Sequence, residues 1–117
     1  MKIVEIETIL KAQVLAGRQY MERTVTAGGA ADLMDDILAS AAKGAALLTG
    51  LTTEHVLRTA KVAGVSAIVF VRGKRPEEHI ITMARTYKIP LLLTDYSLFV
   101  ACGRLYIGGL RGLDGSW

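Results

Sequence analysis

The chain has 117 residues, which fits one domain, and its formal net charge is only +3. Hydrophobic residues make up 51% of it, a high share for a small protein with much surface to cover. No apolar run approaches the ~18 residues of a membrane span, and early acidic residues argue against a signal peptide. Aromatic residues do not interleave with the basic ones, which argues against nucleic-acid binding. We therefore expect a cytoplasmic protein with doubly buried strands and an apolar subunit interface.

The sequence offers few groups for catalysis or metal binding. Cys102 is the only cysteine, which excludes an internal disulfide and a multi-cysteine zinc site, and we expect it to be a small buried apolar residue. Asp35 and Asp36 are adjacent on a predicted helix, so they point ~100° apart and are not expected to share a metal ion. His55 and His79 are expected on exposed helix surfaces. We therefore predict no catalytic cluster, no metal and no cofactor.

The first third of the chain is predicted to hold a helix, two strands and a second helix. The first helix is predicted from apolar residues at helical spacing, which are Ile3, Ile6, Ile9, Leu10 and Val14. A short strand over Val14–Gly17 ends at its glycine. Arg23–Thr26 is predicted as a second strand, followed by a turn at Gly28-Gly29. A helix over Asp32–Ala42 follows.

The middle of the chain begins with a strongly apolar strand over Gly44–Thr49. Thr52 or Thr53 is expected to cap the next helix, because a hydroxyl can accept a bond from the free backbone amides there. Gly64 is expected to end that helix, since glycine adopts the left-handed conformation without strain.

Two units of buried strand, polar turn and helix complete the pattern. Ser66–Val71 and Ile89–Leu93 are the strands, Pro76 is expected at the first position of one helix, and Thr94 or Asp95 is expected to cap the last. Alternating strands and helices predict a mostly parallel sheet flanked by helices, in a single three-layer-like α/β domain. We expect this domain to span residues 1–107 and a frayed, glycine-rich tail to occupy residues 108–117.

Polar residues follow the predicted parallel strands at their carboxyl ends. These ends meet at one edge of an open α/β sheet, and ligands bind there. A hydroxyl, guanidinium groups and helix-terminal amides at that edge suit an anionic or nucleotide-like ligand. The candidate ligand-binding residues are Thr49, Arg72, Gly73, Lys74, Arg75 and Thr94. Ordinary turn and capping roles, in a solvated loop, are the alternative interpretation.

Four stretches together resemble the DRTGG domain and the N-terminal domain of HPr kinase/phosphorylase. They are Gly44–Gly50, Phe70–Gly73, Pro76–Glu78 and Lys88–Thr94, and the resemblance runs to about residue 106. Glu22-Arg23-Thr24 stands where the family has Asp-Arg-Thr, and the glycines come later, at Gly28-Gly29. The resemblance implies an α/β fold and a dimer-forming, regulatory, non-catalytic module. In relatives the DRTGG domain accompanies phosphotransacetylase or the CBS domains of regulated pyrophosphatases. In those pyrophosphatases the CBS domains bind adenine nucleotides.

Three functions remain open from the sequence. The favoured one is a non-catalytic homodimer that senses a nucleotide or other anionic ligand, or docks on a partner enzyme. The Gly28-Gly29 loop and the helix over residues 31–42 are its expected dimer contacts. A protein-docking adaptor without a small-molecule ligand is the first alternative. A phosphotransferase-related enzyme is the second, because stand-alone copies are often labelled as HPr serine kinases, but the chain has no P-loop and Asp95 is the only acid placed to act as a general base.

Overall fold

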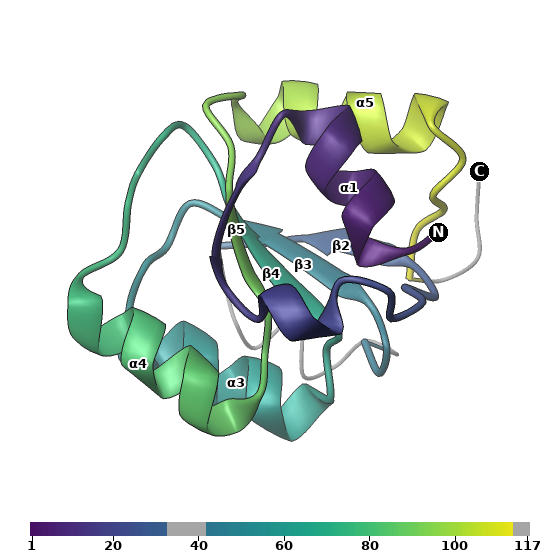
Figure 1. Cartoon of the computed structure of the whole chain (residues 1–117). Helices are drawn as coiled ribbons and strands as arrows, with labels where there is room; N and C mark the ends of the chain where they lie inside the picture. Colours follow the sequence, from purple (N-terminus) through teal and green to yellow (C-terminus); the bar gives the residue numbers. More distant parts are fainter. Residues whose placement is uncertain (33–41, 114–117) are drawn as a thin grey trace.

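The computed structural model describes residues 1–32 and 42–113 of the chain. Within these residues five strands form one sheet in the order β1-β5-β4-β3-β2 (Figure 1). Strands β2 to β5 run parallel, and β1 pairs antiparallel with β5 at one edge. The mostly parallel α/β sheet predicted from the sequence is confirmed. The strands are β1 (Gln13–Ala16), β2 (Gly28–Ala30), β3 (Ala46–Thr49), β4 (Ala67–Phe70) and β5 (Leu91–Leu93).

Helices cover both faces of the sheet, which gives three layers (Figure 1). Helices α1 (Ile3–Leu10) and α5 (Leu98–Ile107) pack on one face, and helices α3 (Glu54–Ala63) and α4 (Glu78–Tyr87) pack on the other. A short 3-10 helix, η1 (Arg18–Tyr20), follows β1. The layers therefore bury two separate apolar cores, one on each side of the sheet.

The two central strands carry apolar residues on both faces because successive strand residues point in opposite directions. In β3, Leu47 packs on the α3 and α4 side, whereas Ala46 and Leu48 pack on the α1 and α5 side. All four residues of β3 and all four of β4 are buried. Such continuous apolar runs are typical of parallel strands that are covered on both faces, and they explain the high apolar content.

Four helix boundaries test the caps predicted from the sequence. Gly64 ends α3 with a φ of +75°, as predicted. Thr53 precedes α3 as expected, but its side chain forms no capping hydrogen bond. Pro76 was expected at the first position of α4, which is wrong, because the helix begins at Glu78. The cap of α5 was expected at Thr94 or Asp95, which is too early. The capping residue is Ser97, whose hydroxyl accepts from the Val100 amide.

Two other expectations in the first half and at the end of the chain are wrong. Residues 23–26 form no named strand; β2 lies instead at Gly28–Ala30, where a turn was expected. Glycine pairs favour turns in general, but here the strand needs residues without side chains, because the C-terminal segment packs closely against it. Residues 108–113 were expected to be frayed, but Leu110 is buried and Arg111 and Gly112 pair with Gly28. The boundary between domain and tail at residue 107 stays a prediction. The predicted helix over residues 32–42 falls almost wholly outside the described residues.

The C-terminal segment crosses the edge strand β2 and packs against both of its faces. The Gly28 amide donates to the Arg111 carbonyl at 2.8 Å. A Cβ added at Gly28 would lie 2.9 Å from Leu110 Cδ2, and one added at Gly29 would lie 2.7 Å from Leu113 Cδ1. Leu110 joins the core under α1 and α5, whereas Leu113 packs against the opposite core. The paired glycines therefore let residues 110–113 approach the sheet edge closely.

We expect Leu110→Ala to lower the free energy of unfolding by about 2–3 kcal/mol, because it leaves a cavity in a packed core. Urea denaturation followed by circular dichroism measures this loss. Val62→Ala is the matched control, since Val62 is 78% exposed and its truncation should change the free energy by less than about 0.5 kcal/mol. Equal stability of the Leu110→Ala and Val62→Ala proteins would show that the tail does not contribute to the fold.

Candidate functional site

The carboxyl ends of β2 and β3 are joined by one carboxylate. Asp32, two residues past β2, accepts from the Thr49 hydroxyl at 3.1 Å and from the Gly50 amide at 3.0 Å. The Thr49 hydroxyl also accepts from the Leu51 amide at 3.1 Å. Thr49 is fully buried, so its hydroxyl is used to fix this turn. Thr49 therefore supports the edge and is not presented to a ligand.

Arg72 follows β4 and lies across the end of β3. A Cβ added to Gly50 would overlap the Arg72 guanidinium, which shows that the guanidinium rests directly on the Gly50 backbone. Arg72 and Gly73 both have left-handed backbones, with φ values of +61° and +64°. Their amides donate to the carbonyls of Tyr96 and Thr94 at 2.8 and 2.9 Å. The loop after β5 thus holds the Arg72 backbone in a conformation that costs a non-glycine residue ~1–2 kcal/mol.

Thr94 follows β5 and is also a structural residue. Its hydroxyl donates to the Leu10 carbonyl at 2.7 Å and accepts from the Tyr96 amide at 3.3 Å. The side chain is buried, and the bond to Leu10 attaches the end of α1 to the sheet. The sequence placed Thr94 at the correct edge, but its hydroxyl is not available to a ligand.

The loop after β4 presents three cations that no described residue pairs with. The side chains of Arg72, Lys74 and Arg75 form no hydrogen bond, ion pair or cation–π contact within the described part of the chain, whereas each of the other six arginines there has at least one such contact. All three residues are exposed. Three like charges within four positions create a local positive potential.

Two acids lie at the same edge and moderate that potential. Asp32 already accepts two hydrogen bonds, and Asp95 lies beside Gly73, where an added Cβ would be 2.8 Å from Asp95 Oδ1. Three cations and two carboxylates leave a charge of +1 at this edge. The structure therefore places the predicted residues Arg72, Gly73, Lys74 and Arg75 in one exposed loop at this edge, and the hydroxyls of Thr49 and Thr94 support the edge from within.

Sequence reasoning missed two residues of this edge, Asp32 and Gly50. Asp32 was assigned to the start of a helix, although an acid two residues after a strand could have been read as a turn residue. Gly50 was read as a strand breaker, which is correct but incomplete. Its contact with Arg72 joins residues 22 positions apart, so only the folded chain reveals it.

The residues that resemble the DRTGG motif lie at the opposite, amino-terminal edge of the sheet. Glu22 pairs with Lys2 at 2.8 Å, and the Arg23 guanidinium stacks on Tyr20 and donates to the Lys88 carbonyl at 3.1 Å. The Arg23 contact reaches the C-terminal end of α4, whose partial negative charge favours a nearby cation. This segment therefore holds α1 and α4 in place and is not part of the carboxyl-edge site.

The remaining titratable residues offer no reactive cluster. The described residues contain no group of three histidine, cysteine or acidic side chains that could hold a metal ion. His79 lies 3.5 Å from Glu54 and 3.4 Å from Glu77 on an exposed surface, as expected from the sequence. Burial raises the pKa of the Cys102 thiol, which disfavours the thiolate. None of the helices in the described ranges is long and apolar enough to cross a membrane.

The fold and this edge define a small α/β module whose loops, rather than a reactive cluster, carry its polar groups. The family model of the DRTGG domain matches residues 5–106, and the chain belongs to this family. The resemblance inferred from the sequence is thus confirmed. A DRTGG domain is a regulatory module and not a catalytic one, which agrees with the expectation that this chain is not an enzyme.

A solved structure shares the fold over nearly the whole chain. It contains the CBS and DRTGG domains of the regulatory region of Clostridium perfringens pyrophosphatase, complexed with the activator diadenosine tetraphosphate. The TM-score is 0.75 at 17% sequence identity, over 99% of this chain and 50% of that chain. The present chain therefore spans half the length of that protein's crystallised region. No curated protein matches the chain in sequence.

We expect Thr94→Val to lower the free energy of unfolding by about 1–3 kcal/mol, because the buried Leu10 carbonyl loses its hydrogen-bond donor. Thermal denaturation of the purified variant measures this change. Thr86→Val is the control, since the Thr86 hydroxyl only bonds the Thr82 carbonyl on an exposed helix surface. A Thr94→Val protein as stable as Thr86→Val would mean that the bond to Leu10 does not hold α1 on the sheet.

Proposed function

We propose that this DRTGG domain is a non-catalytic sensing module, which binds a nucleotide or another anionic ligand at the carboxyl edge of its sheet. One observation carries the proposal: the cations of Arg72, Lys74 and Arg75 share one exposed loop and have no partner among the described residues, and the Arg72 guanidinium lies on the Gly50 backbone. The left-handed Arg72 backbone supports it, because strain of this kind persists where the surrounding structure imposes it and is common at ligand sites. The likeness to a regulatory region that is crystallised with the activator diadenosine tetraphosphate supports a regulatory role; because the CBS domains of such relatives are expected to bind the nucleotide, the anion site proposed here rests on the cations of this chain.

The exposed face of α5 supports a homodimer as the acting form. Phe99 and Ile107 are 87% and 88% exposed, and Val100 lies beside them on the same face. Gly103 lies between these side chains, and an added Cβ there would meet nothing within 4 Å. A small residue flanked by large apolar ones allows two copies of a helix to cross closely about a two-fold axis. This face replaces the dimer contacts expected at Gly28-Gly29, where the C-terminal segment already covers the glycines.

Ligand binding is tested by thermal shift with ATP, diadenosine tetraphosphate and inorganic pyrophosphate. A ligand that binds only the folded state at a hundredfold excess over its Kd stabilises the protein by ~2.7 kcal/mol. Arg72→Gly should abolish the shift and leave the unliganded protein as stable or more so, because glycine adopts a positive φ without strain. Gly50→Ala should weaken the shift, because the added methyl group displaces the Arg72 guanidinium.

Arg85→Ala is the matched control, since Arg85 lies on α4 and its one ion-pair partner among the described residues is Glu78, at 4.0 Å. It should leave the shift unchanged. If none of the three compounds stabilises the wild-type protein, the anion site is rejected. A protein-docking adaptor then becomes the better interpretation, with the same exposed α5 face available to a partner enzyme.

The homodimer is tested by size-exclusion chromatography with light scattering. We expect the wild-type protein to elute with twice the chain mass, and the double variant Phe99→Ser, Ile107→Ser to elute as a monomer with an unchanged circular dichroism spectrum. Val62→Ser is the control, because Val62 is 78% exposed on α3, on the opposite side of the sheet. A wild-type monomer, or a dimer that survives the double substitution, would contradict this interface.

A further inference from the structure

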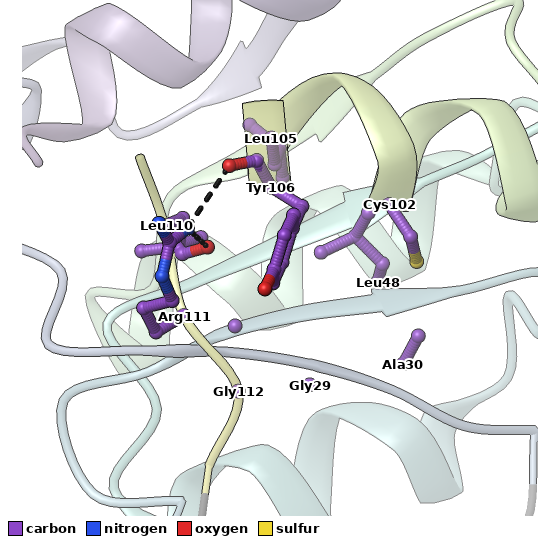
Figure 2. Close-up of a pocket in the computed structure, with 10 residues that line it drawn as sticks. Gly29, Ala30, Leu48, Cys102, Leu105, Tyr106, Leu110, Arg111 and Gly112 are labelled. Carbon is purple, nitrogen blue, oxygen red and sulfur yellow. Dashed lines mark hydrogen bonds between the residues drawn. The ribbon is translucent and has the colours of Figure 1, made fainter. Parts of the chain in front are cut away.

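A pocket of about 190 Å³ lies between the edge strand β2 and helix α5, away from the Arg72 loop (Figure 2). Its walls come from the neighbouring strands β2 and β3 and from α5 with the C-terminal segment that directly follows it. Strand β2 and Leu48 of β3 form the floor, α5 forms one side, and the C-terminal segment forms the other. Besides Gly28 and Gly29, the residues that shape it are Ala30, Leu48, Cys102, Leu105, Tyr106 and Leu110.

Tyr106 lines the pocket and lies between Arg111 of the C-terminal segment and Cys102 of α5 (Figure 2). The Arg111 guanidinium lies 4.4 Å from the centroid of the Tyr106 ring and also donates to the Tyr106 carbonyl at 3.0 Å. Figure 2 shows Arg111 on one side of this ring, with Cys102 and Leu48 on the other. One face of the phenol is therefore occupied, and the other face looks onto an apolar space. A flat ring in that space would stack on Tyr106 at the offset typical of aromatic pairs.

The backbone of Ala30 adds hydrogen-bonding groups to the rim. Ala31 donates to the Leu48 carbonyl, and Gly28 donates outward to the Arg111 carbonyl. Because strand residues alternate in direction, the amide and carbonyl of Ala30 point outward with those of Gly28. β2 is an edge strand, and the bridge between Gly28 and Gly112 covers only its beginning. No described residue pairs with these two groups, so Ala30 offers a donor and an acceptor side by side.

From these features we propose that the pocket binds a neutral, planar heteroaromatic ring of the nucleobase type. The ring stacks on the free face of Tyr106 and pairs an adjacent donor and acceptor with the backbone of Ala30. Drug-sized ligands occupy pockets of ~300–1,000 Å³, so about 190 Å³ suits one ring system rather than a whole nucleotide. Among the described residues that line the pocket Arg111 alone is charged, and its guanidinium is already engaged by the ring and carbonyl of Tyr106, which favours an uncharged ligand.

This proposal goes beyond the anion site and does not depend on it. The probe is adenosine, which carries a base but no phosphate. Cys102 provides the readout, because it lines the pocket and is the only thiol of the chain. Burial raises the pKa of this thiol, so labelling by iodoacetamide is measured at mildly alkaline pH. At a tenfold excess of adenosine over its Kd, labelling should slow about tenfold, since only the empty pocket admits the reagent.

Four comparisons make the result specific. Ribose, which lacks the base, should give no protection. Tyr106→Ala should abolish protection by adenosine, whereas Tyr106→Phe, which keeps the stacking ring, should retain it. Ala30→Leu should fill the pocket and make labelling slow with or without adenosine. Arg72→Gly should leave protection intact, which separates this site from the anion site.

Three results would overturn the proposal. The first is unchanged labelling by adenosine, guanosine, cytidine and uridine, each at its solubility limit, with wild-type protein that circular dichroism shows to be folded. The second is equal protection by ribose, which would assign the effect to the sugar. The third is protection that persists in a folded Tyr106→Ala protein, which would place the ligand elsewhere.

Discussion

Burial of β3 and β4 on both faces is the constraint on which the rest of the molecule depends. Every residue of these two strands is inaccessible to solvent, so helices must cover both sides. Helices α3 and α4 connect successive parallel strands and cover one side. The other side is left to α1 and α5, which come from the two ends of the chain. The domain is therefore closed by its terminal helices, and the Thr94 hydroxyl attaches one of them to the sheet.

The same arrangement decides where the polar loops gather. Parallel strands place all of their carboxyl ends at one edge, and the loops after β3, β4 and β5 meet there. Asp32 and the loop after β5 use their hydrogen-bonding groups to hold the backbone of this edge. The cations after β4 have no partner among the described residues, and hydrogen bonds to the loop after β5 hold their backbone. A rigid loop with free charges is well suited to recognising an anion, since little ordering remains to be done on binding.

The short, glycine-rich edge strand β2 is the place where the C-terminal segment packs onto the sheet. Its glycines let the C-terminal segment approach, with Leu110 and Leu113 on opposite faces. That approach covers the start of an exposed edge, which would otherwise be free to pair with another chain. It also builds one wall of the pocket beside Tyr106. The resemblance to the DRTGG family ends before this segment, which lies beyond the matched residues 5–106.

The sequence by itself determined the fold class, the central strands and the edge at which Arg72 and its neighbours lie. These follow from local patterns: apolar runs of strand length, helical spacing and Gly64 as a helix end. The boundaries at Pro76 and Ser97 were missed by a few residues, because local capping signals compete. Only the tertiary structure decided the roles of Thr49 and Thr94, the contact of Gly50 with Arg72, and the path of the C-terminal segment over β2. Each of these depends on residues distant in sequence, whose approach is set by packing and not by any local pattern.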